Sequence, residues 1–95
     1  MEIENHIFKN IKFLNSPNFN KRPEKSDISL IVIHSISLPP EVYGNNYVED
    51  FFMNKLNISD HDYFNEIKDI RVSSHIYIKR TGEMIQFVPL NMRAW

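Results

Sequence analysis

Residues 72–88 read VSSHIYIKRTGEMIQFV, and this stretch decides the fold class. Successive side chains of an extended strand point to opposite faces, so the residues of each strand divide between two faces. One face carries Ser74, Ile76, Ile78 and Arg80, and the other carries His75, Tyr77 and Lys79. Thr81-Gly82 supplies a turn, because glycine adopts a positive φ without steric cost. The stretch therefore predicts an antiparallel hairpin that ends before Pro89.

Upstream, residues 29–34 read SLIVIH and form a continuous apolar run rich in β-branched residues. This pattern predicts a strand that is covered on both faces. Pro39-Pro40 halts regular structure shortly after it. We expect a short edge strand near residues 11–14 and extended loop in the rest of residues 1–27.

Two helices are predicted between the strands. Gly44-Asn45-Asn46 opens the first, because asparagine is a good N-cap, and Tyr47, Val48, Phe51 and Phe52 follow at helical spacing. The second is expected to begin at Ser59 or Asp60, with Tyr63, Phe64 and Ile67 as its apolar stripe. A strand, two helices and a hairpin predict an α/β or α+β domain with a mixed sheet. Of the two we expect the α/β class, with a mixed central sheet and flanking helices.

The composition excludes several classes of protein. The chain has 95 residues, enough for one small domain, and a net charge of −1 without any basic cluster, so nucleic acid is not an expected partner. It has no cysteine, so histidines and carboxylates would have to hold any metal. The N-terminal residues lack a signal-peptide pattern, and no apolar stretch reaches 18 residues. We therefore expect a cytoplasmic protein with no membrane partner.

Three histidines are candidates for chemistry. His34 ends the predicted buried strand, where it could be a zinc ligand or a polar strand end bonded to backbone. His61 lies between Asp60 and Asp62, which suits either a metal site or a solvated helix start. His75 could be a core histidine bonded to a neighbour or the wall of a site shared with His34.

Arginine and tryptophan side chains near the end of the sequence suggest a binding surface. Arg71, Arg93 and Trp95 could form a wall for an anion or a sugar, because guanidinium groups match carboxylates and indole faces stack on sugar rings. Each of these residues alone is more often a surface or packing residue. Composition and spacing thus predict a small α/β domain with a histidine-lined site.

Several segments taken together resemble one enzyme family. They are residues 15–19 (NSPNF), 22–23 (RP), 30–40 (LIVIHSISLPP), 61–64 (HDYF), 71–75 (RVSSH), 80–83 (RTGE), 86–89 (QFVP) and 93–95 (RAW). The chain resembles the cytoplasmic anhydro-N-acetylmuramoyl-L-alanine amidases of the AmpD type, in the zinc amidase and peptidoglycan-recognition superfamily. The resemblance covers nearly the whole chain from about residue 12.

The resemblance implies an activity and a set of site residues. Members of this family cleave the amide between the lactyl group of anhydro-muramic acid and L-Ala, during cell-wall recycling, so anhydro-muramyl peptides are the implied partners. Their single zinc is held by two histidines and an aspartate, and His34 matches the first histidine. Tyr63 matches a position beside the site, and Arg71, Ala94 and Trp95 match positions that border the substrate cleft. Ser35 stands at a substrate-contact position where this type usually has asparagine.

The family pattern continues past the segment matched by Arg93-Ala94-Trp95. The positions of its catalytic Glu, second His, Lys and ligand Asp have no match in this sequence. We therefore expect residues 1–95 to be the N-terminal portion of a single amidase domain, with a fold incomplete at its C-terminal end, no catalytic residue and weak zinc binding. Three interpretations follow: an amidase inactive as this chain, one half of a split amidase, or a non-catalytic muropeptide-binding module.

An incomplete sheet also predicts exposed apolar surface. We expect Ile76, Ile78, Ile85 and Phe87 of the hairpin to leave a face or an edge uncovered. Uncovered apolar edges drive association, so self-association through the sheet edge is expected.

Overall fold

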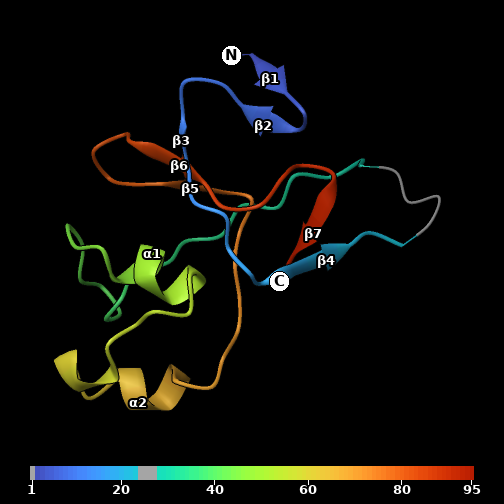
Figure 1. Ribbon diagram of the computed structural model, residues 1–95. Helices are drawn as coiled ribbons and strands as arrows, with labels where there is room; N and C mark the ends of the chain where they lie inside the picture. The colour runs from blue at the N-terminus through green and yellow to red at the C-terminus, as the bar shows by residue number, and fades with distance from the viewer. Residues whose placement is uncertain (1, 24–27) are drawn as a thin grey trace.

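The computed structural model describes residues 2–23 and 28–95. The elements, in chain order, are β1 (Ile3–Glu4), β2 (Ile7–Phe8), β3 (Lys12–Phe13), β4 (Phe19–Lys21), α1 (Tyr47–Phe52), the 3₁₀ turn η1 (Ile58–Asp60), α2 (Phe64–Ile67), β5 (Ile76–Ile78), β6 (Met84–Gln86) and β7 (Met92–Ala94). In the described residues they form a β1–β2 hairpin, a mixed sheet of order β3-β6-β5 and an antiparallel β4–β7 pair (Figure 1). The predicted α/β class with a mixed sheet is confirmed.

The hairpin predicted from residues 72–88 is present. β5 and β6 run antiparallel with Tyr77 opposite Ile85, and Lys79 N–H donates to the Glu83 carbonyl at 2.8 Å to close the turn. Gly82 has a φ of 92°, which explains why glycine is needed there. The edge strand expected near residues 11–14 is β3, which pairs in parallel with β6 and makes the sheet mixed.

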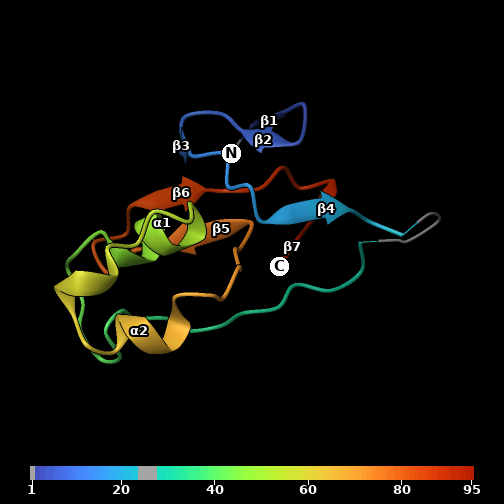
Figure 2. The same cartoon turned by 60° about the horizontal axis from the view of Figure 1, so that its bottom comes forward.

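The core lies between the hairpin and the helices. The rings of Phe52 and Phe87 meet edge to face with centroids 5.1 Å apart, and Tyr77 makes a second edge contact with Phe52 at 6.4 Å. Ile85 and Phe87 are fully buried, so the expectation that they would be exposed is wrong; α1 covers their face of the hairpin (Figure 2). Ile78 is exposed as expected, and Ile76 is half-buried.

The first helix begins where the sequence predicts, and the second does not. α1 starts at Tyr47, whose N–H is accepted at 3.0 Å by the side chain of Asn45, while Asn46 makes no side-chain cap bond. The second predicted helix is wrong as a single unit, because it is divided into η1 and α2. His61 takes an extended backbone between them (φ −159°, ψ 142°), which breaks helical continuity, and α2 begins only at Phe64.

The strand predicted at residues 29–34 is not formed. This segment is an extended coil without a ladder partner among the described residues, and Figure 2 shows it running apart from the sheets. Leu30, Ile31 and Ile33 are 76%, 86% and 90% exposed. An apolar sequence favours a strand only where neighbouring strands satisfy its backbone groups and other layers cover its side chains.

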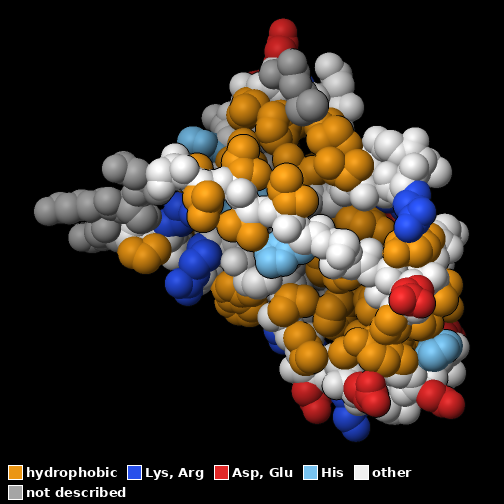
Figure 3. Space-filling model, turned by 180° about the vertical axis from the view of Figure 1, so that it is seen from behind, with side chains coloured by type: hydrophobic (Ala, Val, Ile, Leu, Met, Phe, Trp, Pro, Cys, Tyr) orange, Lys and Arg blue, Asp and Glu red, His pale blue; other side chains and the backbone are white. Residues whose placement is uncertain are grey.

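An apolar groove separates this segment from the hairpin. Its volume is about 570 Å³; Ile31, Val32 and Ile33 line one side, and Ile76 and Ile78 lie on the other. β5, the nearer strand of the hairpin, has no partner on its outer edge among the described residues. Figure 3 shows hydrophobic side chains spread over the face of the molecule opposite to that of Figure 1. Such a surface favours association with other polypeptide.

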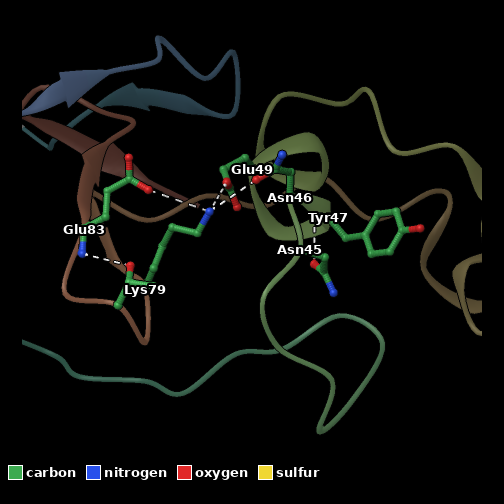
Figure 4. A network of polar contacts seen from close by, with 7 residues as sticks. Asn45, Asn46, Tyr47, Glu49, Lys79 and Glu83 are labelled. Carbon is green, nitrogen blue, oxygen red and sulfur yellow. Dashed lines mark hydrogen bonds and ion pairs between the residues drawn. The ribbon is translucent and has the colours of Figure 1, made fainter.

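An ion pair between the buried Glu49 and the half-buried Lys79 links α1 to the hairpin (Figure 4). Lys79 Nζ lies 3.0 Å from Glu49 Oε2 and 3.2 Å from Asn46 Oδ1, with Glu83 Oε1 at 3.8 Å. The hydrogen bond to Glu49 raises the pKa of Lys79, and burial followed by the Glu49 charge raises the pKa of Tyr77. The other Glu49 oxygen, Oε1, is buried without a hydrogen bond. Glu49 therefore depends on Lys79 for compensation of its charge.

Replacing Lys79 by methionine should lower the free energy of unfolding by about 3 kcal/mol, because it leaves a buried carboxylate unpaired. The pKa of folded Lys79 is raised above 10.5, so the stabilisation is complete at neutral pH and is lost as pH rises through the folded pKa. Urea unfolding at pH 7 measures the difference. Lys68→Met, at an exposed lysine, is the matched control, and an equal loss in both variants would contradict the role of the ion pair.

The wild-type chain should self-associate at micromolar concentration through the apolar segment at residues 28–33. Ile31→Lys and Ile33→Lys place a charge on that surface and should shift the population toward monomer in light scattering. Ile3→Lys is the matched control, since Ile3 is 52% exposed on the separate β1–β2 hairpin. A monodisperse wild-type monomer would refute the expectation.

Candidate functional site

The proposed zinc ligand lies on the exposed segment that was predicted to be a strand. His34 and Ser35 are both exposed, and the groove lining includes Ile33 but not His34. Within residues 2–23 and 28–95, no group of three or more histidine, aspartate or glutamate residues is placed to hold a metal ion. The described residues thus present His34 as a single imidazole.

His61 has a local structural role. Its Nδ1 accepts the Tyr63 N–H at 3.0 Å, and its ring lies 5.7 Å from that of Phe64. These contacts shape the turn between η1 and α2. They agree with the interpretation of His61 as part of a helix start.

His75 links the hairpin to the last strand. Its Nε2 lies 2.8 Å from the Met92 carbonyl and donates to it in the matching tautomer. The guanidinium of Arg22, 3.4 Å from the same nitrogen, instead donates to the Leu90 carbonyl at 3.1 Å. His75 is thus a half-buried histidine bonded to backbone, and it also lines the apolar groove beside Arg22.

The most developed polar surface lies on the β4–β7 pair. Asn20 stands directly opposite Arg93 in the ladder, and Trp95 lies two residues further along, so all three side chains emerge on one face. Asn20 Oδ1 accepts from Arg93 Nε at 2.9 Å and from Trp95 Nε1 at 3.0 Å. The opposite face carries Phe19, Met92 and Ala94, which pack against the core.

The main chain of Trp95 is held by Ser73. Ser73 N–H donates to the Trp95 carbonyl at 2.9 Å, and Trp95 N–H donates to Ser73 Oγ at 3.2 Å. Ser73 Oγ in turn donates to the Asn18 carbonyl at 2.7 Å. Trp95 is nevertheless 48% exposed, so its indole is held in place while part of it faces solvent.

The remaining predicted residues lie elsewhere. Tyr63 is half-buried against the core. Arg71 is exposed and donates to the Lys68 carbonyl at 3.2 Å, and it lines a small cavity of about 100 Å³ beside Phe51 and Ile67. Of the wall predicted from Arg71, Arg93 and Trp95, the structure joins the last two through Asn20.

Sequence reasoning missed Asn20 and Ser73. Residues 19–21 were assigned to loop, so the alternation that brings Asn20 and Trp95 to one face was not visible. The spacing of Arg93 and Trp95, two residues apart, was the available signal for a strand with a shared face.

No helix in the described part of the chain has the length and hydropathy needed to cross a membrane.

Comparison with known proteins gives a consistent result. The family model for N-acetylmuramoyl-L-alanine amidase matches residues 24–95. The 1,6-anhydro-N-acetylmuramyl-L-alanine amidase AmpD of Haemophilus influenzae is 50% identical over 94 residues, which are 99% of this chain and 51% of that protein. The AmpD of Escherichia coli K12 is 40% identical over 80 residues, which cover 84% of this chain and 44% of that one.

Solved structures agree with these relatives. A crystal structure of a selenomethionine AmpD derivative superposes with a TM-score of 0.95 at 36% identity, covering all of this chain and 53% of that one. The solution structure of Citrobacter freundii AmpD gives a TM-score of 0.60 at 36% identity, covering all of this chain and 51% of that one. The chain thus spans about half the length of the relatives that it matches. Because the family model matches residues 24–95, which are most of the sequence, this chain belongs to the N-acetylmuramoyl-L-alanine amidase family.

Proposed function

We propose that this chain contributes the substrate-facing part of a cytoplasmic amidase that hydrolyses the lactyl–L-Ala amide of anhydro-muramyl peptides. In this proposal residues 1–95 are the N-terminal portion of a single amidase domain. The observation that carries the proposal is the backbone agreement with an AmpD crystal structure, at a TM-score of 0.95, over the whole chain. The names of the similar relatives supply the substrate class.

The proposed substrate wall combines exposed residues with half-buried ones. Trp95 offers an indole, and Ala94 forms part of the strand beneath it. Arg71 and Ser35 are exposed, and Tyr63 is half-buried. These five residues are assigned to muropeptide contact by family resemblance, with Trp95 the most firmly oriented of them through its bonds to Asn20 and Ser73.

Zinc belongs to this proposal as the family's cofactor, with His34 as a ligand. A catalytic zinc site needs three protein ligands and one open position. The described residues supply no such group, so they do not fit the ion by themselves. We therefore assign no chemical step to zinc, and no catalytic residue, within this chain.

A second candidate is favoured by the apolar groove. Segment 28–33 and the outer edge of β5 both lack ladder partners among the described residues, and the groove between them is apolar. The similar relatives have about twice the length of this chain. In this alternative, further polypeptide completes the sheet as the other half of a split amidase.

The purified chain should retain no stoichiometric zinc after dialysis, because a lone imidazole holds the ion weakly. Metal analysis by atomic absorption checks this, with His34→Ala as the comparison. One zinc per chain that disappears in His34→Ala would contradict the expectation. His6→Ala, another exposed histidine, controls for nonspecific binding by imidazole.

Residues 1–95 alone should release no stem peptide from anhydro-muramyl tripeptide above the uncatalysed rate. Loss of a general base costs about 10²–10⁴-fold, and loss of metal polarisation removes several kcal/mol more of transition-state stabilisation. Adding the unmatched half of the Haemophilus influenzae relative, fused or as a separate chain, should restore hydrolysis, measured by chromatography.

In the completed enzyme, His34→Ala should abolish hydrolysis and His6→Ala should leave it intact. Chelator-sensitive hydrolysis by residues 1–95 alone would contradict the proposal that the catalytic residues lie outside this chain. Failure of both completed forms to act on the tripeptide would count against the amidase proposal itself.

A further inference from the structure

One amide oxygen on the β4–β7 face holds two functional side chains at once. Asn20 Oδ1 accepts from Trp95 Nε1 at 3.0 Å and from Arg93 Nε at 2.9 Å. An amide oxygen has two lone pairs, so this pair of bonds fills its capacity as an acceptor. The tilt of the indole and the direction of the guanidinium are thus fixed by the same atom.

The main chain under this group is also fixed. The ladder places Asn20 opposite Arg93, and Ser73 holds the backbone of Trp95 from the other side by two hydrogen bonds. These backbone contacts still allow the indole to rotate about its side-chain bonds. The bond from Nε1 to Asn20 removes that freedom while 48% of the residue stays exposed.

The arrangement leaves the groups that a ligand would use. A bond at the indole nitrogen holds the ring by its edge and leaves the ring face available for stacking. Arg93 donates to Asn20 through Nε, and its terminal guanidinium nitrogens have no hydrogen-bond acceptor within residues 2–23 and 28–95. An aromatic face beside free N–H donors suits a sugar ring that carries a carbonyl or carboxylate substituent.

We propose that Asn20 is a positioning residue that orients Trp95 and Arg93 into a platform for the sugar end of a muropeptide. The inference rests on the proposed function for its ligand class, and Asn20 itself acts through the two side chains that it holds. Orienting the platform in advance reduces the entropy that the ligand must remove on binding.

The single tryptophan of this sequence makes the inference directly measurable. Hydrogen exchange of the one indole N–H resonance, observed by NMR, reports the Nε1 bond. Fluorescence titration with anhydro-muramyl tripeptide reports binding at the same ring, and the free tripeptide without the sugar is the comparison ligand. We expect the sugar-bearing ligand to change the emission and the free tripeptide to change it much less.

Asn20→Leu removes the acceptor at similar volume. It should speed indole exchange and weaken binding about fivefold, the effect of losing one net hydrogen bond. Asn20→Asp keeps an acceptor for both donors and should restore slow indole exchange. Asn65→Leu, at an exposed asparagine of α2, is the matched control and should behave as wild type.

Circular dichroism melts establish that each variant is folded. Trp95→Phe provides a second route, because it deletes the donor and keeps an aromatic ring. Calorimetry should show weaker binding to Trp95→Phe than to the wild-type chain. Asn20→Leu should lower the affinity of Trp95→Phe by a smaller factor than it lowers the affinity of the wild-type chain, because both changes break the same hydrogen bond.

Wild-type exchange or wild-type affinity in Asn20→Leu would overturn the inference, as would failure of Asn20→Asp to restore slow indole exchange. Failure of the wild-type chain to bind the tripeptide would instead refute the proposed function. In that case the indole exchange rates of the Asn20 variants still decide whether Asn20 orients Trp95.

Discussion

The side-chain amide of Asn18 is the contact on which most of the architecture depends. Asn18 is 2% exposed, and its Nδ2 lies 2.8 Å from the Val72 carbonyl, 2.8 Å from Asn54 Oδ1 and 3.3 Å from the Phe52 carbonyl. Ser16, also buried, donates to the same Phe52 carbonyl. A buried amide is costly unless its hydrogen bonds are made, so this network allows one relative placement of the β3–β4 connection, the end of α1 and the approach to β5. The aromatic contact of Phe52 with Phe87 follows from that placement.

The same network determines where the proposed ligand-binding surface lies. The Asn18 carbonyl accepts from Ser73 Oγ, and Ser73 bonds both backbone groups of Trp95. Asn20, two residues after Asn18, then reaches the indole from the adjacent strand. Contacts that fix the core therefore continue without interruption into contacts that orient Trp95. A change at Asn18 acts on both stability and the platform, whereas a change at Asn20 acts on the exposed side of β4 and leaves the buried network intact.

Features set by local sequence could be predicted, and those set by distant partners could not. The β5–β6 hairpin follows from alternation and from Gly82, and α1 follows from its apolar spacing after Asn45. Segment 29–34 was mispredicted because strand formation depends on neighbours that its own residues do not encode. Burial of Ile85 and Phe87 was missed for a related reason, since α1 covers them through a packing contact across the chain. At the site, Arg93 and Trp95 were recognised by residue type, but Asn20 needed the β4–β7 register.

The two parts of the candidate site differ in how completely they are built. Trp95 is held by Ser73 and Asn20, which are themselves fixed by the ladder and the buried network, so every contact that orients the platform lies within the described residues. His34 follows an extended segment whose apolar side chains are 63–90% exposed at residues 30–33, and no cluster of metal-ligating side chains surrounds it in the described chain. Rigid positioning of a metal ligand needs a supported backbone and partner ligands. The proposed recognition of the muropeptide thus uses structure that this chain already possesses, while the proposed metal chemistry needs segment 28–34 to be paired and covered first.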